Sequence, residues 1–153
     1  MYKRQAYSPY GKECRSLFHA PYDWDQLGID AKGLEIRTLA GYLALWDDGE
    51  YASLVVNPEV DIHTYNQEKF GVATRDIAKR LLYAMLYGCG AAKAGTIIDP
   101  REKNEEKLRV LGRDAIDGFL RGVPALRKLK DQVEETIATR GFLIGLDLSL
   151  IHI

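Results

Sequence analysis

Four side chains able to bind a phosphorylated aromatic ligand recur at a fixed interval in the middle of the chain. Arg75, Lys79 and Tyr83 are four residues apart, and Tyr87 follows at the same interval. In a helix this spacing places the first three on one face, with Tyr87 at its edge. Two cations followed by two phenols suit a triphosphate at one end and an aromatic base at the other. The alternative is an amphipathic helix whose cations are only solvated, and the spacing alone leaves it open.

Two carboxylates precede this stretch. Asp30 ends the short apolar run 27–29, which predicts a buried strand with the acid at its edge, and Glu35 falls at the start of a following helix. A carboxylate fixed at a strand end can hold a divalent metal, with a neighbouring backbone carbonyl as a further ligand. The alternative is structural: Asp30 caps the helix and Glu35 complements its dipole.

One histidine lies between the acids and the cations. His63 follows Asp61, which we expect to be the N-cap of a helix over 62–69 that Gly71 ends. A histidine is by itself more often a packed or surface residue. Beside Arg75 and Lys79 it would be a third donor to phosphate.

The elements that must position these residues are mostly helical. The central stretch 74–90 predicts a helix whose packed face consists of Ile77, Leu81, Ala84 and Met85. Apolar spacing and caps predict five further helices, over 33–47, 50–55, 91–97, 101–121 (capped by Asp99-Pro100) and 124–139. We expect the last two to form an antiparallel hairpin. Strands are predicted at 14–18, with Leu17 and Phe18 packed inward, at 27–30 and from 142 onward. The predicted fold is therefore mainly α with a small β remnant.

Composition limits the possible classes of function. The chain has 153 residues, enough for one buried core, and its net charge of −1 provides no global field that would attract nucleic acid. Two cysteines without metal-ligand spacing indicate free thiols in a reducing compartment, although one disulfide stays open. The start has no apolar signal region, and the apolar runs are too short to cross a membrane, so we expect a soluble intracellular protein.

Two motifs resemble those of family A DNA polymerases, the DNA polymerase I group. The segment 30–37 reads D-x-x-x-L-E-x-R and is similar to motif A. About forty residues later, 75–88 reads R-D-x-x-K-x-x-x-Y-x-x-x-Y-G and is similar to motif B. The upstream segment 8–15 and the intervening segments 49–52 and 61–64 look like the phage replicative branch. The resemblance covers about residues 6–147.

The resemblance implies template-directed DNA synthesis from dNTPs on primer–template DNA, with two Mg²⁺ ions. Asp30 and the carbonyl of Ala31 would bind metal, and Glu35 under the sugar would exclude a 2′-hydroxyl. Tyr83 would pack on that sugar and hydrogen-bond Glu35. His63, Arg75 and Lys79 would hold the triphosphate, and Lys79 would also have a catalytic role by protonating the leaving group. At the template and primer we expect Tyr87, Gly88 and Arg15.

The resemblance also implies an organisation for the chain. Residues 1–32 would be a partial palm, 33–141 a palm helix and the helical fingers, and 142–153 the start of a strand followed by a non-native tail. Residues 1–5 and 148–153 do not continue the family pattern. The His-Asp motif C, which carries the second metal carboxylate, has no match here, so we expect a fragment with negligible activity of its own. Lys32 stands where the family has a small polar residue, and its role stays open.

Two alternatives remain at this point. A single-subunit RNA polymerase shares the motif architecture, although Glu35 under the sugar argues against ribonucleotides. A non-catalytic helical module for nucleic acid or a partner protein would explain the amphipathic helices but not the joint spacing of the motifs. A processivity partner is left open, and the expected location is the cytoplasm of an infected bacterial cell.

Overall fold

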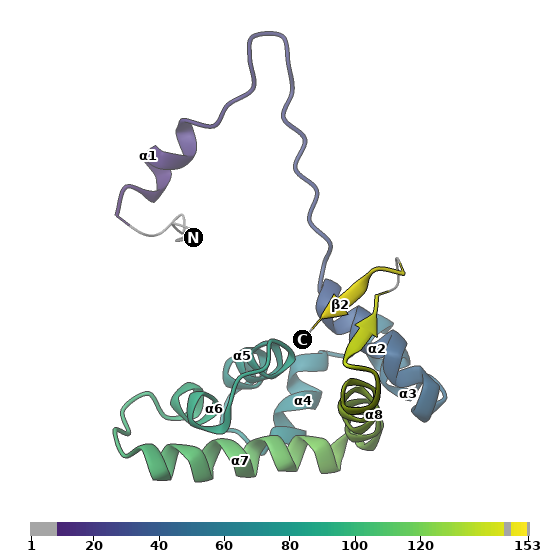
Figure 1. The fold of residues 1–153 in the computed structure, drawn as a ribbon. Helices are drawn as coiled ribbons and strands as arrows, with labels where there is room; N and C mark the ends of the chain where they lie inside the picture. Colours follow the sequence, from purple (N-terminus) through teal and green to yellow (C-terminus); the bar gives the residue numbers. More distant parts are fainter. Residues whose placement is uncertain (1–8, 146–147, 153) are drawn as a thin grey trace. The chain divides into compact units, whose positions relative to one another are not determined.

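The computed structural model describes residues 9–145 and 148–152, and within these ranges it contains eight helices and one two-stranded sheet (Figure 1). The prediction of a mainly α protein with a small β part is confirmed. The chain divides into two units, Met1–Lys32 and Gly33–Ile153, which are described separately below. The expectation that residues 1–5 are not native lies outside the described residues.

The described part of the first unit begins with α1, Gly11–Ser16. The predicted strand at 14–18 is wrong, because its first three residues complete this helix. Leu17 and Phe18, which we expected to pack inward, are 77% and 79% exposed.

The segment that carries Asp30 also differs from its prediction. Residues 24–30 form no regular element, and Leu27 and Ile29 are 83% and 87% exposed, so the predicted buried strand at 27–30 is wrong. A strand needs a neighbour that pairs with its backbone N–H and C=O groups. Within the described residues this segment has no such neighbour.

The second unit opens with two helices joined by a tight turn. These are α2, Leu34–Asp47, and α3, Glu50–Val56. The Asp47 carboxylate accepts the backbone N–H groups of Gly49 at 3.0 Å and Tyr51 at 3.1 Å, so the last residue of α2 organises the start of α3.

Helix α4, Ile62–Phe70, forms as its sequence predicts. The Asp61 carboxylate accepts the N–H groups of His63 and Thr64 as the N-cap, and Gly71 ends the helix with a φ of 66°. Both signals are local, because each satisfies backbone groups within one turn.

The central helix is α5, Arg75–Leu86, and it ends slightly earlier than the whole stretch suggested. Thr74 caps its start through its hydroxyl oxygen. At the other end Gly88 has a φ of 77°, and the N–H groups of Gly88 and Cys89 bond back to the last turn. This arrangement is a Schellman motif, which places the last tyrosine of the stretch outside the helix.

Helices α6, Ala91–Ile98, and α7, Glu105–Gly122, pack backbone against backbone. A β-carbon on Gly95 would lie 2.0 Å from a carbonyl oxygen of α7, and one on Gly112 would lie 2.0 Å from a carbonyl oxygen of α6. The pair can therefore approach this closely only because both residues are glycine.

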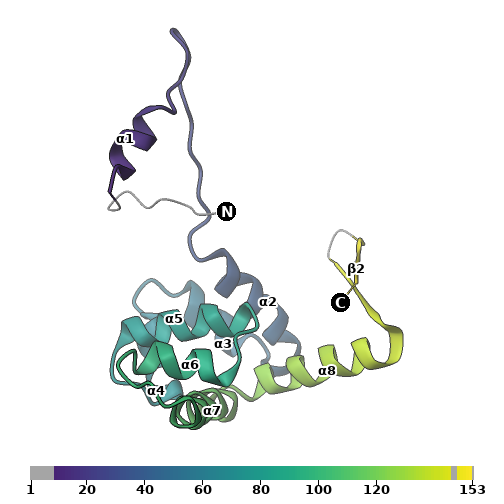
Figure 2. The same cartoon turned by 60° about the vertical axis from the view of Figure 1, so that its left-hand side comes forward.

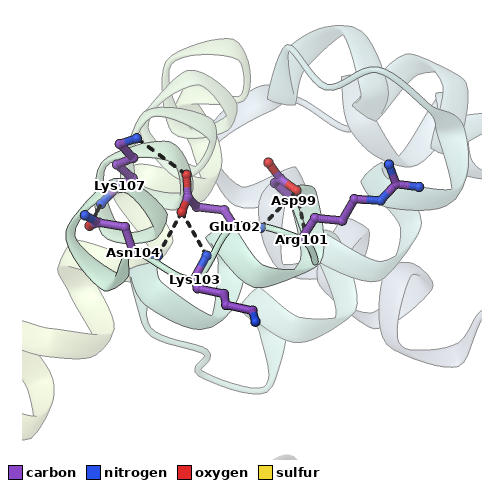
Figure 3. A network of polar contacts seen from close by, with 6 residues as sticks. All are labelled: Asp99, Arg101, Glu102, Lys103, Asn104 and Lys107. Carbon is purple, nitrogen blue, oxygen red and sulfur yellow. Dashed lines mark hydrogen bonds and ion pairs between the residues drawn. The ribbon is translucent and has the colours of Figure 1, made fainter.

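The loop between α6 and α7 is held by its own side chains (Figure 3). Asp99 accepts two following N–H groups, and Glu102 accepts those of Lys103 and Asn104, both at 2.8 Å. Asn104 then caps α7. The predicted cap at Asp99-Pro100 and the helix start at 101 are therefore wrong, because Asp99 forms a turn and the helix begins only at residue 105.

Helix α8, Pro124–Arg140, begins with proline at its first position, as predicted. The expected antiparallel hairpin with α7 is wrong. Figure 1 shows α8 nearly end-on where α7 runs across the view, and Figure 2 shows the reverse, so the two helices cross steeply. Only Val123 separates the two helices, and an antiparallel helix pair needs a connection of about 2–5 residues.

A short hairpin closes the described chain. Strands β1, Phe142–Ile144, and β2, Leu150–His152, pair antiparallel with Leu143 opposite Ile151. The strand predicted from residue 142 is therefore confirmed. The native or non-native origin of residues 148–153 stays a prediction.

The core of the second unit gathers side chains from α2 to α8. Phe70 and Phe119 stack with ring centroids 4.1 Å apart. Leu43, Leu81 and Leu82 are fully buried around them. Because α5 contributes two of these leucines, its packed face fixes the direction in which its polar face points.

Candidate nucleotide-binding site

The exposed face of α5 carries the predicted cations. Arg75 and Lys79 are exposed and Tyr83 is partly buried, whereas Ala78 lies on the buried side. The predicted packed face is confirmed, because Leu81 is buried and Ile77, Ala84 and Met85 are partly buried and pack against the core. Leu82 is also fully buried and was not predicted. Helix α5 thus has one exposed polar face and one packed apolar face, as the spacing predicts.

Arg75 is tied to the start of the neighbouring helix. Its Nε donates to Oδ2 of Asp61 at 2.6 Å, and both side chains are about half exposed. This bond, with the N–H groups at the helix start, holds the pKa of the Asp61 carboxyl below its ordinary value. This pair could not be predicted from residue spacing, because Asp61 already had a local role as an N-cap.

His63 joins the same cluster. Burial, followed by the positive charges of Arg75 and Lys79, lowers the pKa of its imidazole. Its Nδ1 is buried and has no hydrogen-bond partner within the described residues. Its ring lies 6.2 Å from that of Tyr83, centroid to centroid. An imidazole with an unsatisfied nitrogen therefore lies beside the ring of Tyr83 and within the electrostatic influence of Arg75 and Lys79.

Lys79 is the most available cation of the cluster. It is exposed and forms no ion pair in the part of the chain that the structure describes. A free ammonium group beside His63 gives the end of the surface formed by Asp61, His63, Arg75 and Lys79 a net positive charge, since Asp61 offsets only Arg75.

A hydrogen bond joins α5 to α2 at the other end of the face. The Tyr87 hydroxyl donates to Oε1 of Glu35 at 2.9 Å, and this bond raises the pKa of Tyr87. The expectation that Tyr83 makes this bond is therefore wrong. Tyr83 packs beside His63 instead, and the Glu35 charge only adds to the effect of burial in raising its pKa. Because Gly88 ends the helix, the Tyr87 ring is free to reach α2.

The remaining predicted residues belong to the first unit. Arg15 lies exposed on α1, and Asp30 and Ala31 lie exposed in the segment without regular structure. No group of three or more His, Cys, Asp or Glu side chains among the described residues is arranged to hold a metal ion. One carboxylate and one carbonyl do not fit a complete divalent-metal site.

The second unit thus brings together three helices around one surface. We refer to Glu35, His63, Arg75, Lys79, Tyr83 and Tyr87 as the α5 cluster. Asp61 lies beside this cluster and bonds to Arg75, a neighbour that the motif spacing did not identify. The cluster offers cations and an imidazole at one end, and phenols with a carboxylate at the other.

No helix in the described ranges is long and apolar enough to span a membrane. No protein-family model matches the chain. It is 38% identical over 138 residues to the DNA-directed DNA polymerases of Enterobacteria phage T3 and Escherichia phage T7, an alignment covering 85% of this chain and 18% of each relative. It is 33% identical over 144 residues to that of Escherichia phage Phieco32, covering 79% of this chain and 22% of the relative. The chain thus spans about a fifth of their length.

Proposed function

We propose that the chain belongs to the family of phage DNA-directed DNA polymerases and that it binds the incoming deoxynucleoside triphosphate during template-directed DNA synthesis. The observation that carries this proposal is the α5 cluster. His63, Arg75 and Lys79 gather on one surface although they come from two helices.

The positive end of the cluster suits the triphosphate. Arg75 supplies a planar fork of donors and Lys79 a mobile point charge, the two usual side chains that bind phosphate. The imidazole of His63 would add a further N–H donor to a phosphate oxygen through the ring nitrogen that carries the proton. We propose that Lys79, as the free cation, also donates the proton to the leaving pyrophosphate.

The aromatic end suits the sugar and the base. Tyr83 would pack on the deoxyribose, and Glu35 below it would exclude a 2′-hydroxyl group. The hydrogen bond from Tyr87 supports this role, because it holds the carboxylate in one orientation. Tyr87, Gly88 and Arg15 would contact the template or primer.

A divalent metal is part of the proposed chemistry, with two Mg²⁺ ions as the specific proposal. Such ions supply charge to the reacting phosphate oxygens when bound. Asp30 and the Ala31 carbonyl would contribute ligands, but they require further ligands to complete a site. We therefore assign no reaction step to the described residues of the first unit. In line with this, we expect primer extension by the chain alone to be negligible.

The proposed organisation follows the same assignment. Residues 1–32 would belong to a palm, 33–141 to a palm helix and the fingers, and 142–153 to the start of a further strand. Primer–template DNA would be the partner, with a processivity factor and the host cytoplasm as further proposals.

Titration of the chain with a dNTP tests the proposal. We expect Arg75→Ala and Lys79→Ala each to weaken binding by roughly 10–100-fold, since a hydrogen bond to a charged group contributes about 1.5–3 kcal/mol. Arg80→Ala is the matched control, because Arg80 is an exposed cation on the same helix outside the cluster. Equal loss in all three variants would indicate a nonspecific charge effect.

Comparison of dCTP with CTP tests the sugar preference. We expect dCTP to bind more tightly, and Glu35→Ala to reduce the difference. Tighter binding of CTP would favour an RNA polymerase, and absence of binding to either nucleotide would favour a non-catalytic helical module.

A further inference from the structure

The carboxylate of Asp61 contacts both helices that carry the phosphate-binding candidates. Its Oδ1 accepts the N–H groups of His63 at 2.9 Å and Thr64 at 3.2 Å. Its Oδ2 accepts the Nε–H of Arg75 at 2.6 Å. One side chain therefore fixes the first turn of α4 and also holds the guanidinium at the start of α5.

The choice of nitrogen on Arg75 matters for ligand binding. Arginine has five N–H donors in a planar fork, and the bond to Asp61 uses the single donor on Nε. The two Nη groups, with four donors, remain available for phosphate oxygens. A long side chain held at Nε has also lost part of its rotamer freedom before a ligand arrives, which reduces the entropy lost on binding.

We propose that Asp61 is a positioning residue that holds Arg75 ready for the triphosphate, an inference that rests on the proposed function. This positioning role and the negative charge of Asp61 predict opposite changes in dNTP affinity when Asp61 is replaced. As an anion beside the cluster, Asp61 would repel a triphosphate, and its removal would then tighten binding. The positioning role gives the opposite sign, so one measurement separates the two.

Two substitutions isolate the positioning role from the capping role. Asn and Ser both cap helices well, so Asp61→Asn and Asp61→Ser keep the start of α4. Asn offers no negative charge to the Nε–H, and Ser is too short to reach it. We expect both variants to melt within about 3 °C of the wild type, and to bind dNTP roughly tenfold more weakly in calorimetric titration.

Two further readouts separate positioning from a general structural effect. In an Arg75→Gln background, Asp61→Asn should no longer weaken dNTP binding, because the group that it positions is absent and only the loss of a repelling negative charge remains. In the wild type, the Nε–Hε signal of Arg75 in ¹H–¹⁵N NMR should exchange slowly with water, and Asp61→Asn should abolish that protection. Asn104→Ser, a cap exchange at the start of α7, should change neither affinity nor this signal.

The outcomes distinguish a failure of the proposed nucleotide-binding function from a failure of the positioning role of Asp61. If the wild type and Arg75→Ala bind dNTP equally, the proposed function fails. If Arg75→Ala weakens binding but both Asp61 variants bind as well as the wild type, or more tightly, the positioning role is wrong and the proposed function stands.

Discussion

The packing of α6 against α7 allows a quantitative test of the fold that supports the site. A β-carbon on Gly112 would lie 2.0 Å from the carbonyl oxygen of Ala91 and 2.6 Å from the backbone nitrogen of Gly95. Ordinary contacts of this kind exceed about 3 Å, so Gly112→Ala must push the helices apart by about 1 Å. Both obstacles are backbone atoms, and they cannot rotate away as a side chain does.

The expected loss of stability follows from this displacement. Overpacking costs about 1–3 kcal/mol, and a backbone obstacle places Gly112→Ala at the upper end of that range. The better helix propensity of alanine offsets about 1 kcal/mol. We therefore expect a net loss of about 2 kcal/mol, which lowers the melting temperature by roughly 4–12 °C for a domain of this size.

Thermal unfolding followed by circular dichroism measures this effect. The matched control is Gly41→Ala in α2, where nothing lies within 4 Å of an added β-carbon. That substitution should leave stability unchanged or raise it by up to about 1 kcal/mol. A Gly112→Ala protein that melts at or above the wild-type temperature would refute the backbone contact between α6 and α7.

Three further predictions concern individual polar groups. Asn66→Ala should destabilise the protein by about 1–3 kcal/mol in urea unfolding, because it leaves the buried Tyr51 hydroxyl, whose pKa burial raises to about 12, without its partner. Glu35→Gln should lower the pKa of Tyr87 toward its ordinary value, measured by NMR titration of the labelled ring; an unchanged pKa would contradict the hydrogen bond. The pKa of His63 lies below its ordinary value of 6.5, so the unfolded chain binds this proton first and the free energy of unfolding should fall as pH drops below about 6.5. His63→Gln should remove that part of the pH dependence, and an equal slope in both proteins would contradict the lowered pKa of His63.

Local signals were sufficient to predict several elements. Asp61 and Thr74 cap their helices, and Gly71 and Pro124 stand at helix ends where we expected them. Each of these residues acts within one turn of its own position, so neighbouring residues contain the information needed. The exposed face of α5 was predictable for the same reason.

Predictions that depended on residues far away in the sequence, or on a choice between two competing caps, were wrong. The strand expected at 27–30 needs a pairing neighbour, and periodicity cannot show whether one is present. At the start of α7, two good N-cap residues compete, and Asp99 forms a turn while Asn104 caps the helix.

The hydrogen-bond partners of the site residues could not be predicted from the sequence. Asp61 with Arg75 and Glu35 with Tyr87 are joined by tertiary packing, at separations of 14 and 52 residues. The spacing on α5 allows either Tyr83 or Tyr87 to reach α2. The choice follows from where the helix ends and from the space beside His63.

The bond between Glu35 and Tyr87 has a consequence for the order of folding. It joins residues that are 52 positions apart through two partly or fully solvated side chains. Its stabilisation therefore offsets little of the entropy that is lost when that loop closes. We therefore expect this contact to form after the surrounding core, and substitutions in it to leave the folding rate unchanged. On this expectation, substitutions at these two positions would change the surface that would recognise the nucleotide without slowing the folding of the helices that hold it.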